Sequence, residues 1–256
     1  MTRKKGSDER CGEFYLDLMK RCLVNTIYQD AAYPSSEVEP GVFDSEVRAE
    51  GRDWPTIAHT MIGLRRLDDI QFCVEDVLAR GVPGDLVETG VWRGGATIFM
   101  RAILKAHDVT DRRVWVADSF EGLPPPNPER YPRDEGDRLY TADQLRVSLE
   151  EVQANFSRYG LLDGQVRFLK GWFRETLPGA PIERLAVMRL DGDMYESTMD
   201  ALTYLYPKLS PHGHVIIDDY GAIAACRAAV QDFREAHRIR EPIRRIDWTG
   251  VCWQRT

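Results

Sequence analysis

Acidic side chains crowd the segment that follows one apolar run near the last quarter of the chain, in "LAVMRLDGDMYES". Asp191, Asp193 and Glu196 fall within six positions there, and a second acidic pair, Asp218 and Asp219, ends the run "HVIIDD". Repulsion between close carboxylates is unfavourable unless a cation or a proton intervenes. Oxygen-only ligands suit a hard divalent cation, and we expect Mg²⁺. If the two apolar runs are neighbouring strands, we therefore expect Asp191, Asp218 and Asp219 to converge on such an ion, with Asp193 alongside.

A glycine-rich turn follows another apolar run, in "DLVETGVWRGGATIFM". Glu88 would end a strand, and Gly90, Gly94 and Gly95 would allow a tight turn into a helix. The N-terminus of such a helix favours polar or anionic groups of a ligand. The segment does not match the dinucleotide fingerprint G-x-G-x-x-G.

Two further runs end in residues that could hold a nucleoside. Asp118 ends "VWVADS", where its carboxylate could accept the two hydroxyls of a ribose, or where Asp118 or Ser119 could simply cap the next helix. Gly171 and Trp172 follow "VRFLK", and the indole could stack on a nucleobase or serve in packing.

The elements that must position these residues alternate between strands and helices. Five β-rich runs, at 85–89, 113–119, 166–171, 185–191 and 214–219, are separated by helical stretches, which predicts a parallel sheet covered on both faces. The tail 243–256 is typical of an antiparallel hairpin. In an open parallel sheet, ligands bind beyond the carboxyl ends of the strands. We expect a disordered leader over 1–12, an N-terminal helical cover over 13–80, a core over 81–256, and a proline-rich lid near 123–140.

Composition narrows the function classes. The net charge of −7 and the pI near 5.4 argue against nucleic acid or an anionic membrane as the main partner. Five cysteines without a CxxC motif indicate reduced thiols, and no apolar run reaches the ~18 residues that span a bilayer. We therefore predict a cytoplasmic protein.

The strings "VETGVWRGG", "VWVADSF", "LDGD" and "IIDDY" resemble those of S-adenosylmethionine-dependent class I methyltransferases, and more narrowly the macrocin O-methyltransferase family. The likeness extends from about Tyr15 to Trp253 and includes "TIAHTMIG", "NFSRYGLLD" and "GWFRETLP". It implies an α/β fold with a Rossmann-like sheet of seven strands, the last antiparallel, and an N-terminal helical cover. It also implies methyl transfer to a deoxysugar hydroxyl on an antibiotic glycoside.

The resemblance assigns roles residue by residue. It implies that the cofactor is S-adenosylmethionine, that Mg²⁺ is bound, that the other partner is a small-molecule glycoside, and that the protein forms a homodimer or higher homo-oligomer. The implied cofactor-binding residues are Glu88, Thr89, Gly90, Asp118, Ser119, Gly171, Trp172 and Met61. The implied magnesium ligands are Asp191, Asp218 and Asp219, and Asp193 is the implied general base.

Three alternatives stay open. A nicotinamide-dependent oxidoreductase shares the sheet and the glycine turn but leaves "IIDD" unexplained. A metal-dependent glycosyltransferase could use "DGD" but does not account for "VETGVWRGG". A non-catalytic protein on the same scaffold would have no reason to retain the repelling acids.

Overall fold

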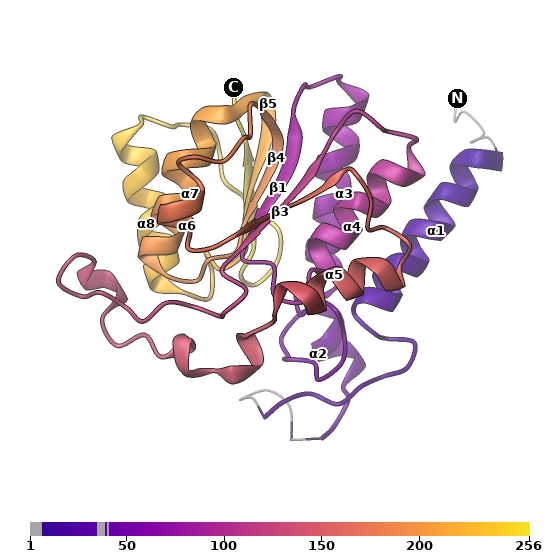
Figure 1. Cartoon of the computed structure of the whole chain (residues 1–256), viewed down its shortest axis with the longest axis horizontal. Coiled ribbons are helices and arrows are strands. Elements are labelled where there is room, and N and C mark those ends of the chain that lie inside the picture. Colours follow the sequence, from indigo (N-terminus) through magenta and orange to yellow (C-terminus); the bar gives the residue numbers. More distant parts are fainter. Residues whose placement is uncertain (1–6, 35–38, 40) are drawn as a thin grey trace.

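A seven-stranded sheet forms the centre of the protein (Figure 1). The computed structural model describes residues 7–34, 39 and 41–256. The strand order is β3-β2-β1-β4-β5-β7-β6. The strands are β1 (Asp85–Thr89), β2 (Val114–Asp118), β3 (Val166–Lys170), β4 (Leu185–Leu190), β5 (Leu209–Ile217), β6 (Arg244–Arg245) and β7 (Val251–Gln254).

Strands β1 to β5 are parallel, and β7 runs antiparallel to both β5 and β6. The predicted fold class, a seven-stranded sheet with its last strand antiparallel, is therefore confirmed. Every residue of β4 is buried, as expected of a central parallel strand covered on both faces. One of these residues is Arg189, a charged side chain in an otherwise apolar strand.

Helices cover both faces of the sheet (Figure 1). One apolar cluster joins the sheet to α1 (Ser7–Leu23), α3 (Gly63–Ala79), α4 (Gly95–Ala106) and α5 (Leu149–Arg158). A second cluster joins the other face to α7 (Tyr195–Leu205) and α8 (Ala224–Ala236), beside the short α6 (Phe173–Thr176). The described helices thus form the two outer layers of an α/β/α sandwich.

Buried ion pairs hold the N-terminal cover together internally. The side chain of Arg48, in α2 (Ser45–Ala49), is 1% exposed and contacts Asp30 at 2.8 Å and Asp53 at 2.7 Å. Helix α3, which we predicted within the cover, packs in the same apolar cluster as β1 and α4. Helix α1 begins at Ser7, inside the stretch predicted as a leader, while residues 1–6 lie outside the described residues.

The segment between β2 and α5 contains three short 3₁₀ turns, η1 (Pro132–Asp134), η2 (Leu139–Thr141) and η3 (Asp143–Leu145), and no strand. It passes below the sheet in Figure 1, and Leu123, Leu139 and Leu145 line the cavity described next. None of the described helices has both the length and the apolar character needed to span a bilayer.

Candidate active site

A cavity of about 320 Å³ opens at the carboxyl ends of β1, β2, β4 and β5. It is where an open parallel sheet is expected to bind ligands. The predicted site residues that line it are Met61, Glu88, Gly90, Asp118, Ser119, Gly171, Trp172, Asp191, Asp193, Asp218 and Asp219. Thr89 is the exception, because its side chain is fully buried and does not reach the cavity wall.

Gly90 brings the end of β1 against the end of β4. Its φ of 77° lies in the left-handed region, and a Cβ atom there would lie 1.6 Å from the carbonyl oxygen of Asp191. The amide of Asp191 in turn donates to the carbonyl of Thr89 at 2.9 Å. Only glycine permits this approach, which sets the glycine turn and the first acidic residue side by side.

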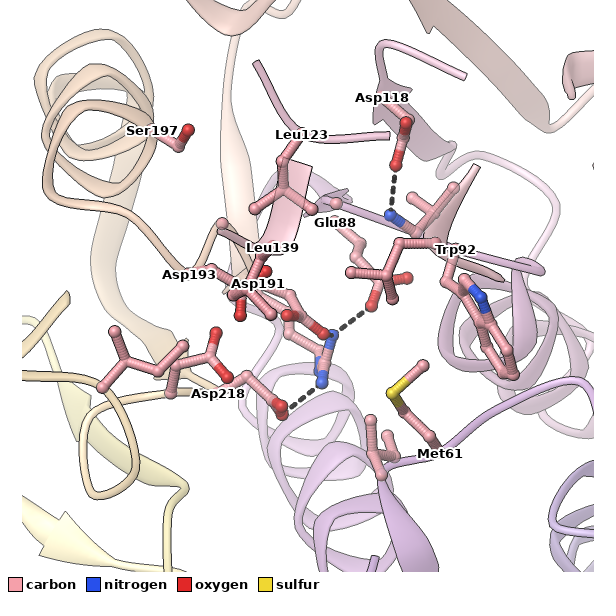
Figure 2. Close-up of a pocket in the computed structure, with 18 of the residues that line it drawn as sticks. Met61, Glu88, Trp92, Asp118, Leu123, Leu139, Asp191, Asp193, Ser197 and Asp218 are labelled. Carbon is pink, nitrogen blue, oxygen red and sulfur yellow. Dashed lines mark hydrogen bonds and ion pairs between the residues drawn. The ribbon is translucent and has the colours of Figure 1, made fainter. Parts of the chain in front are cut away.

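Asp118 is fixed by backbone groups on both of its carboxylate oxygens. Oδ2 accepts from the amide of Val91 and Oδ1 from that of Phe120, each at 2.7 Å. One of these two bonds is drawn as a dashed line at Asp118 in Figure 2. Burial raises the pKa of Asp118, while these N–H groups oppose the rise. Each oxygen keeps a second lone pair, so the carboxylate can still accept hydroxyl groups from the cavity.

The carbonyl of Asp118 accepts from the amide of Gly171 at 2.9 Å, which joins the exits of β2 and β3. Trp172 precedes α6 and lines the cavity with its half-buried side chain. Ser119 donates its hydroxyl to the carbonyl of Gly122 at 2.7 Å, so it stabilises the loop that follows β2. These contacts place the expected nucleoside-binding residues on one wall.

A buried ion-pair network lies under the cavity floor, and the sequence reasoning missed its two cations. Arg189 contacts Glu88 and Asp218, and it contacts Asp191 at 2.9 Å. The dashed lines in Figure 2 end on the carboxylates of Glu88 and Asp218. Arg66, from α3, contacts the other oxygen of Asp218. The signal for Arg189 was present, since an arginine inside the apolar run "LAVMRL" must find buried carboxylates. Arg66 carries no comparable signal.

Glu88, which contacts Arg189 in this network, has a raised pKa. Burial raises it to about 8, Arg189 opposes the rise, and Asp191 and Asp218 add to it. Its Oε2 atom is buried without a hydrogen-bond partner among the described residues. That oxygen is available to a cationic or hydrogen-bond-donating group of a ligand.

Asp191, Asp193 and Asp219 form a compact carboxylate cluster, in which each offers an oxygen within 4.8 Å of the others. Burial and the neighbouring carboxylates raise the pKa of Asp191 to about 6, and they raise those of Asp193 and Asp219 well above the usual range. Oδ2 of Asp219 is buried without a partner among the described residues. An all-oxygen set with an unpartnered buried atom fits a hard divalent cation.

Asp218 stands apart from this cluster in one respect. Both of its oxygens already accept from guanidinium groups, one from Arg66 and one from Arg189. Asp193 has a φ of 56°, which is unusual for a residue other than glycine and is often found at functional sites. The structure thus brings all four predicted acids to one wall, but it groups Asp193 more closely than Asp218 with Asp191 and Asp219.

The remaining walls are largely apolar. In Figure 2, Leu123 and Leu139 of the loop after β2 lie near Asp191 and Asp193, and the thioether of Met61 points into the same space. Trp54 and Trp248 extend this wall from the N-terminal cover and from the β6–β7 turn. The cavity therefore combines an acidic floor with apolar surfaces able to exclude water.

Comparison with known proteins gives concordant matches. The family model described as Macrocin-O-methyltransferase (TylF) matches residues 12–255. The chain is 61% identical to the 8-demethyl-8-(2,3-dimethoxy-alpha-L-rhamnosyl)-tetracenomycin-C 4'-O-methyltransferase of Streptomyces olivaceus, covering 97% of this chain and 95% of that one. It is 56% identical to the mycinamicin III 3''-O-methyltransferase of Micromonospora griseorubida, covering 95% and 97%.

Among solved structures, the O-methyltransferase NovP superposes with a TM-score of 0.91 at 55% identity, covering 96% of this chain and 99% of that one. The calicheamicin methyltransferase CalS11 superposes with a TM-score of 0.61 at 18% identity, covering 99% of each chain. At that identity, the second match concerns the fold alone.

Proposed function

The chain belongs to the macrocin O-methyltransferase family, and from that premise we propose that it methylates a hydroxyl of a rhamnose-like deoxysugar on a secondary-metabolite glycoside. The methyl donor would be S-adenosylmethionine, the reaction would depend on Mg²⁺, and its place would be in antibiotic biosynthesis. The observation that carries this proposal is the contact between Gly90 and Asp191, because it sets a cofactor-type turn directly beside an acidic cluster in one cavity. Two relatives support the acceptor class, since one is named for the methylation of a rhamnosyl tetracenomycin and the other for that of mycinamicin III.

The donor side of the cavity fits S-adenosylmethionine. The unpartnered Oε2 of Glu88 is suited to the ammonium group of the methionyl part. Asp118 has lone pairs free for ribose hydroxyls, and the indole of Trp172, which lines the same cavity, would pack on the adenine. Bound there, S-adenosylmethionine supplies an electrophilic methyl group on a sulfonium.

The acidic side of the cavity fits the metal. We propose that Asp191, Asp218 and Asp219 hold Mg²⁺, with Asp218 using the lone pairs that Arg66 and Arg189 leave free. The ion would supply positive charge that lowers the pKa of the acceptor hydroxyl and fixes its orientation.

Asp193 is the proposed general base. Its oxygen lies within 4.8 Å of oxygens of Asp191 and Asp219, so it can take the proton of a hydroxyl placed at the cluster. Asp193 would take the proton as the hydroxyl oxygen bonds to the methyl carbon of the donor, and the methyl–sulfur bond would break with its electron pair left on the donor's sulfur. General-base catalysis contributes roughly 10²- to 10⁴-fold, and alignment of oxygen, carbon and sulfur contributes more.

The charges around the cavity favour a neutral glycoside over a nucleotide-sugar. Within the described part of the chain, four arginines line it, and each contacts a carboxylate: Arg52 with Glu50, Arg66 with Asp218, Arg174 with Glu196, and Arg189 with Glu88. A diphosphate would have to compete with those carboxylates and approach the acidic cluster. The same charges, together with the family, disfavour a glycosyltransferase or a nicotinamide-dependent oxidoreductase.

The proposal is tested by incubating the purified protein with S-adenosylmethionine and a panel of rhamnosyl glycosides. Nucleotide-linked rhamnose is the comparison substrate, and Mg²⁺ or a chelator is added in parallel. Mass spectrometry should detect one added methyl on a glycoside in the presence of Mg²⁺. Methylation of nucleotide-linked rhamnose alone would refute the acceptor class, and turnover that a chelator leaves unchanged would refute the metal.

The homo-oligomeric state and the cytoplasmic location stay predictions. Light scattering of the purified protein tests the first, and fractionation of the producing cell tests the second.

A further inference from the structure

Asp134, which no step above uses, caps a helix in a distant part of the chain. It ends η1 in the loop after β2 and is 1% exposed. Its Oδ1 accepts from the amide of Tyr195 at 2.6 Å and its Oδ2 from that of Glu196 at 3.0 Å. These are the first two residues of α7, whose own N-cap residue, Met194, makes no side-chain capping bond.

The cap is therefore supplied from 61 residues earlier in the chain. Amides in the first turn of a helix lack partners within the helix, and the helix dipole favours a carboxylate there. Both oxygens of Asp134 are used in this way. Sequence patterns could not reveal the cap, because capping signals are local and this one joins two segments only through tertiary structure.

On one side, the cap fixes the loop. The amide of Asp137 donates to the carbonyl of Asp134 at 3.1 Å, and the carboxylate of Asp137 accepts from the amide of Leu139 at 2.9 Å. The ring of Tyr131 packs on that of Tyr195 with centroids 6.0 Å apart. Asp134 thus stands at the centre of the contacts that hold Leu139 in the cavity wall.

On the other side, the cap fixes the turn that carries the proposed base. Tyr195 follows Asp193 by two residues, and between them the amide of Met194 donates to the carbonyl of Gly192 at 2.5 Å. Asp193 is held at a φ of 56°, a conformation that persists only where the surroundings enforce it. The first turn of α7 is the part of those surroundings nearest in sequence.

We propose that Asp134 is a positioning residue that links closure of the loop over the cavity to the placement of Asp193. One carboxylate contacts both elements. Removing its hydrogen bonds should therefore free the loop after β2 and the turn that carries Asp193 together. The consequence for turnover rests on the proposed function, whereas the consequence for the backbone does not.

The kinetic test compares Asp134→Ala and the nearly isosteric Asp134→Asn with the unmodified protein. A displacement of about 1 Å at a reacting group can cost about 10²-fold in rate. We expect kcat to fall by about that factor in Asp134→Ala and by less in Asp134→Asn, which keeps one acceptor oxygen. The KM for the glycoside should rise, and the Kd for S-adenosylmethionine, measured by calorimetry, should stay within about twofold.

The matched control is Ser148→Ala. Ser148 caps α5 through the amide of Glu151 at 3.1 Å, at the far end of the same loop, and does not line the cavity. It should lower the melting temperature without lowering kcat. Unchanged kcat in either folded Asp134 variant, or loss of cofactor affinity as large as the loss of kcat, would overturn the proposal.

Hydrogen exchange gives a readout that needs no substrate. Amides of Tyr195 and Glu196 and of the segment 131–142 should exchange faster in both Asp134 variants, and together, while α8 keeps its protection. If the exchange changes but no glycoside is methylated by the unmodified protein, the proposed function fails and the link stands. Faster exchange in only one of the two segments would overturn the link.

Discussion

Mg²⁺ should stabilise the unmodified protein by relieving repulsion within the cluster of Asp191, Asp193 and Asp219. These residues offer oxygens within 4.8 Å of one another. At that separation and an effective dielectric constant of about 20, each ionised pair repels by about 3.5 kcal/mol. A doubly charged cation removes this penalty, so the folded protein should bind the ion and the unfolded chain should not.

The size of the effect follows from linkage. A ligand present at about 100 times its Kd and bound only by the folded state adds about 2.7 kcal/mol of stability. In a chain of 256 residues, this corresponds to a rise in melting temperature of roughly 5 to 10 °C. The assay is a thermal unfolding titration of chelator-treated protein with MgCl₂.

The variants decide where the ion lies. Asp219→Asn should abolish the rise, and Asp111→Asn, which alters an exposed acid elsewhere, should retain it. Asp193→Asn should also retain it while lowering kcat, and Asp218→Asn should lose it. Failure of Mg²⁺ to raise the melting temperature would refute the metal site. If Asp218→Asn keeps the Mg²⁺-induced rise in melting temperature and Asp193→Asn loses it, Asp193 is the metal ligand and Asp218 is not.

Three other perturbations test the surroundings of the site. Arg189→Met should lower the free energy of unfolding by about 3 to 5 kcal/mol in urea titrations, because it leaves buried carboxylates uncompensated; a loss under about 1 kcal/mol would contradict the network. Gly90→Ala should abolish calorimetric binding of S-adenosylmethionine, because its Cβ would lie 1.6 Å from the carbonyl of Asp191; retained binding would show that the turn can yield. Burial, with nearby arginines, lowers the pKa of His59 from 6.5 to about 4. Because the folded protein favours neutral His59, the stability that this preference contributes is present above pH 6.5 and is lost as the pH falls through 4. In His59→Phe, the free energy of unfolding should therefore fall less steeply with decreasing pH. The effect should reach at most about 3 kcal/mol before discounting for partial exposure, and an unchanged pH dependence of unfolding would contradict the assignment.

Much of the fold could be predicted from local pattern. β-rich runs of five to seven residues, separated by amphipathic helices, predicted the parallel strands, and the tail predicted the antiparallel hairpin. Acids and glycines at the ends of those runs indicated the site, because the carboxyl ends of parallel strands share one edge of the sheet. The family resemblance added the cofactor and the reaction.

The arrangement of the four acids needed the structure. All four acids follow the ends of their strands, where the backbone is no longer extended: Asp218 and Asp219 lie in a bend, and Asp193 has a φ of 56°. The alternation of side chains along a strand therefore does not place them. Asp218 contacts buried arginines, while Asp219 joins the cluster with Asp191 and Asp193. The strings "DD" and "DGD" do not indicate which of their carboxylates will contact the buried arginines.

Residue types and their order along the chain thus determined which strands form, where their polar ends lie and what chemistry those ends can support, because these properties depend on near neighbours. Only the tertiary structure decided that Arg66 and Arg189 balance Asp218, and that Asp134 caps the helix behind Asp193. Those pairings join residues 152, 29 and 61 positions apart, and contacts at such separations are selected by packing of the whole molecule rather than by any local preference.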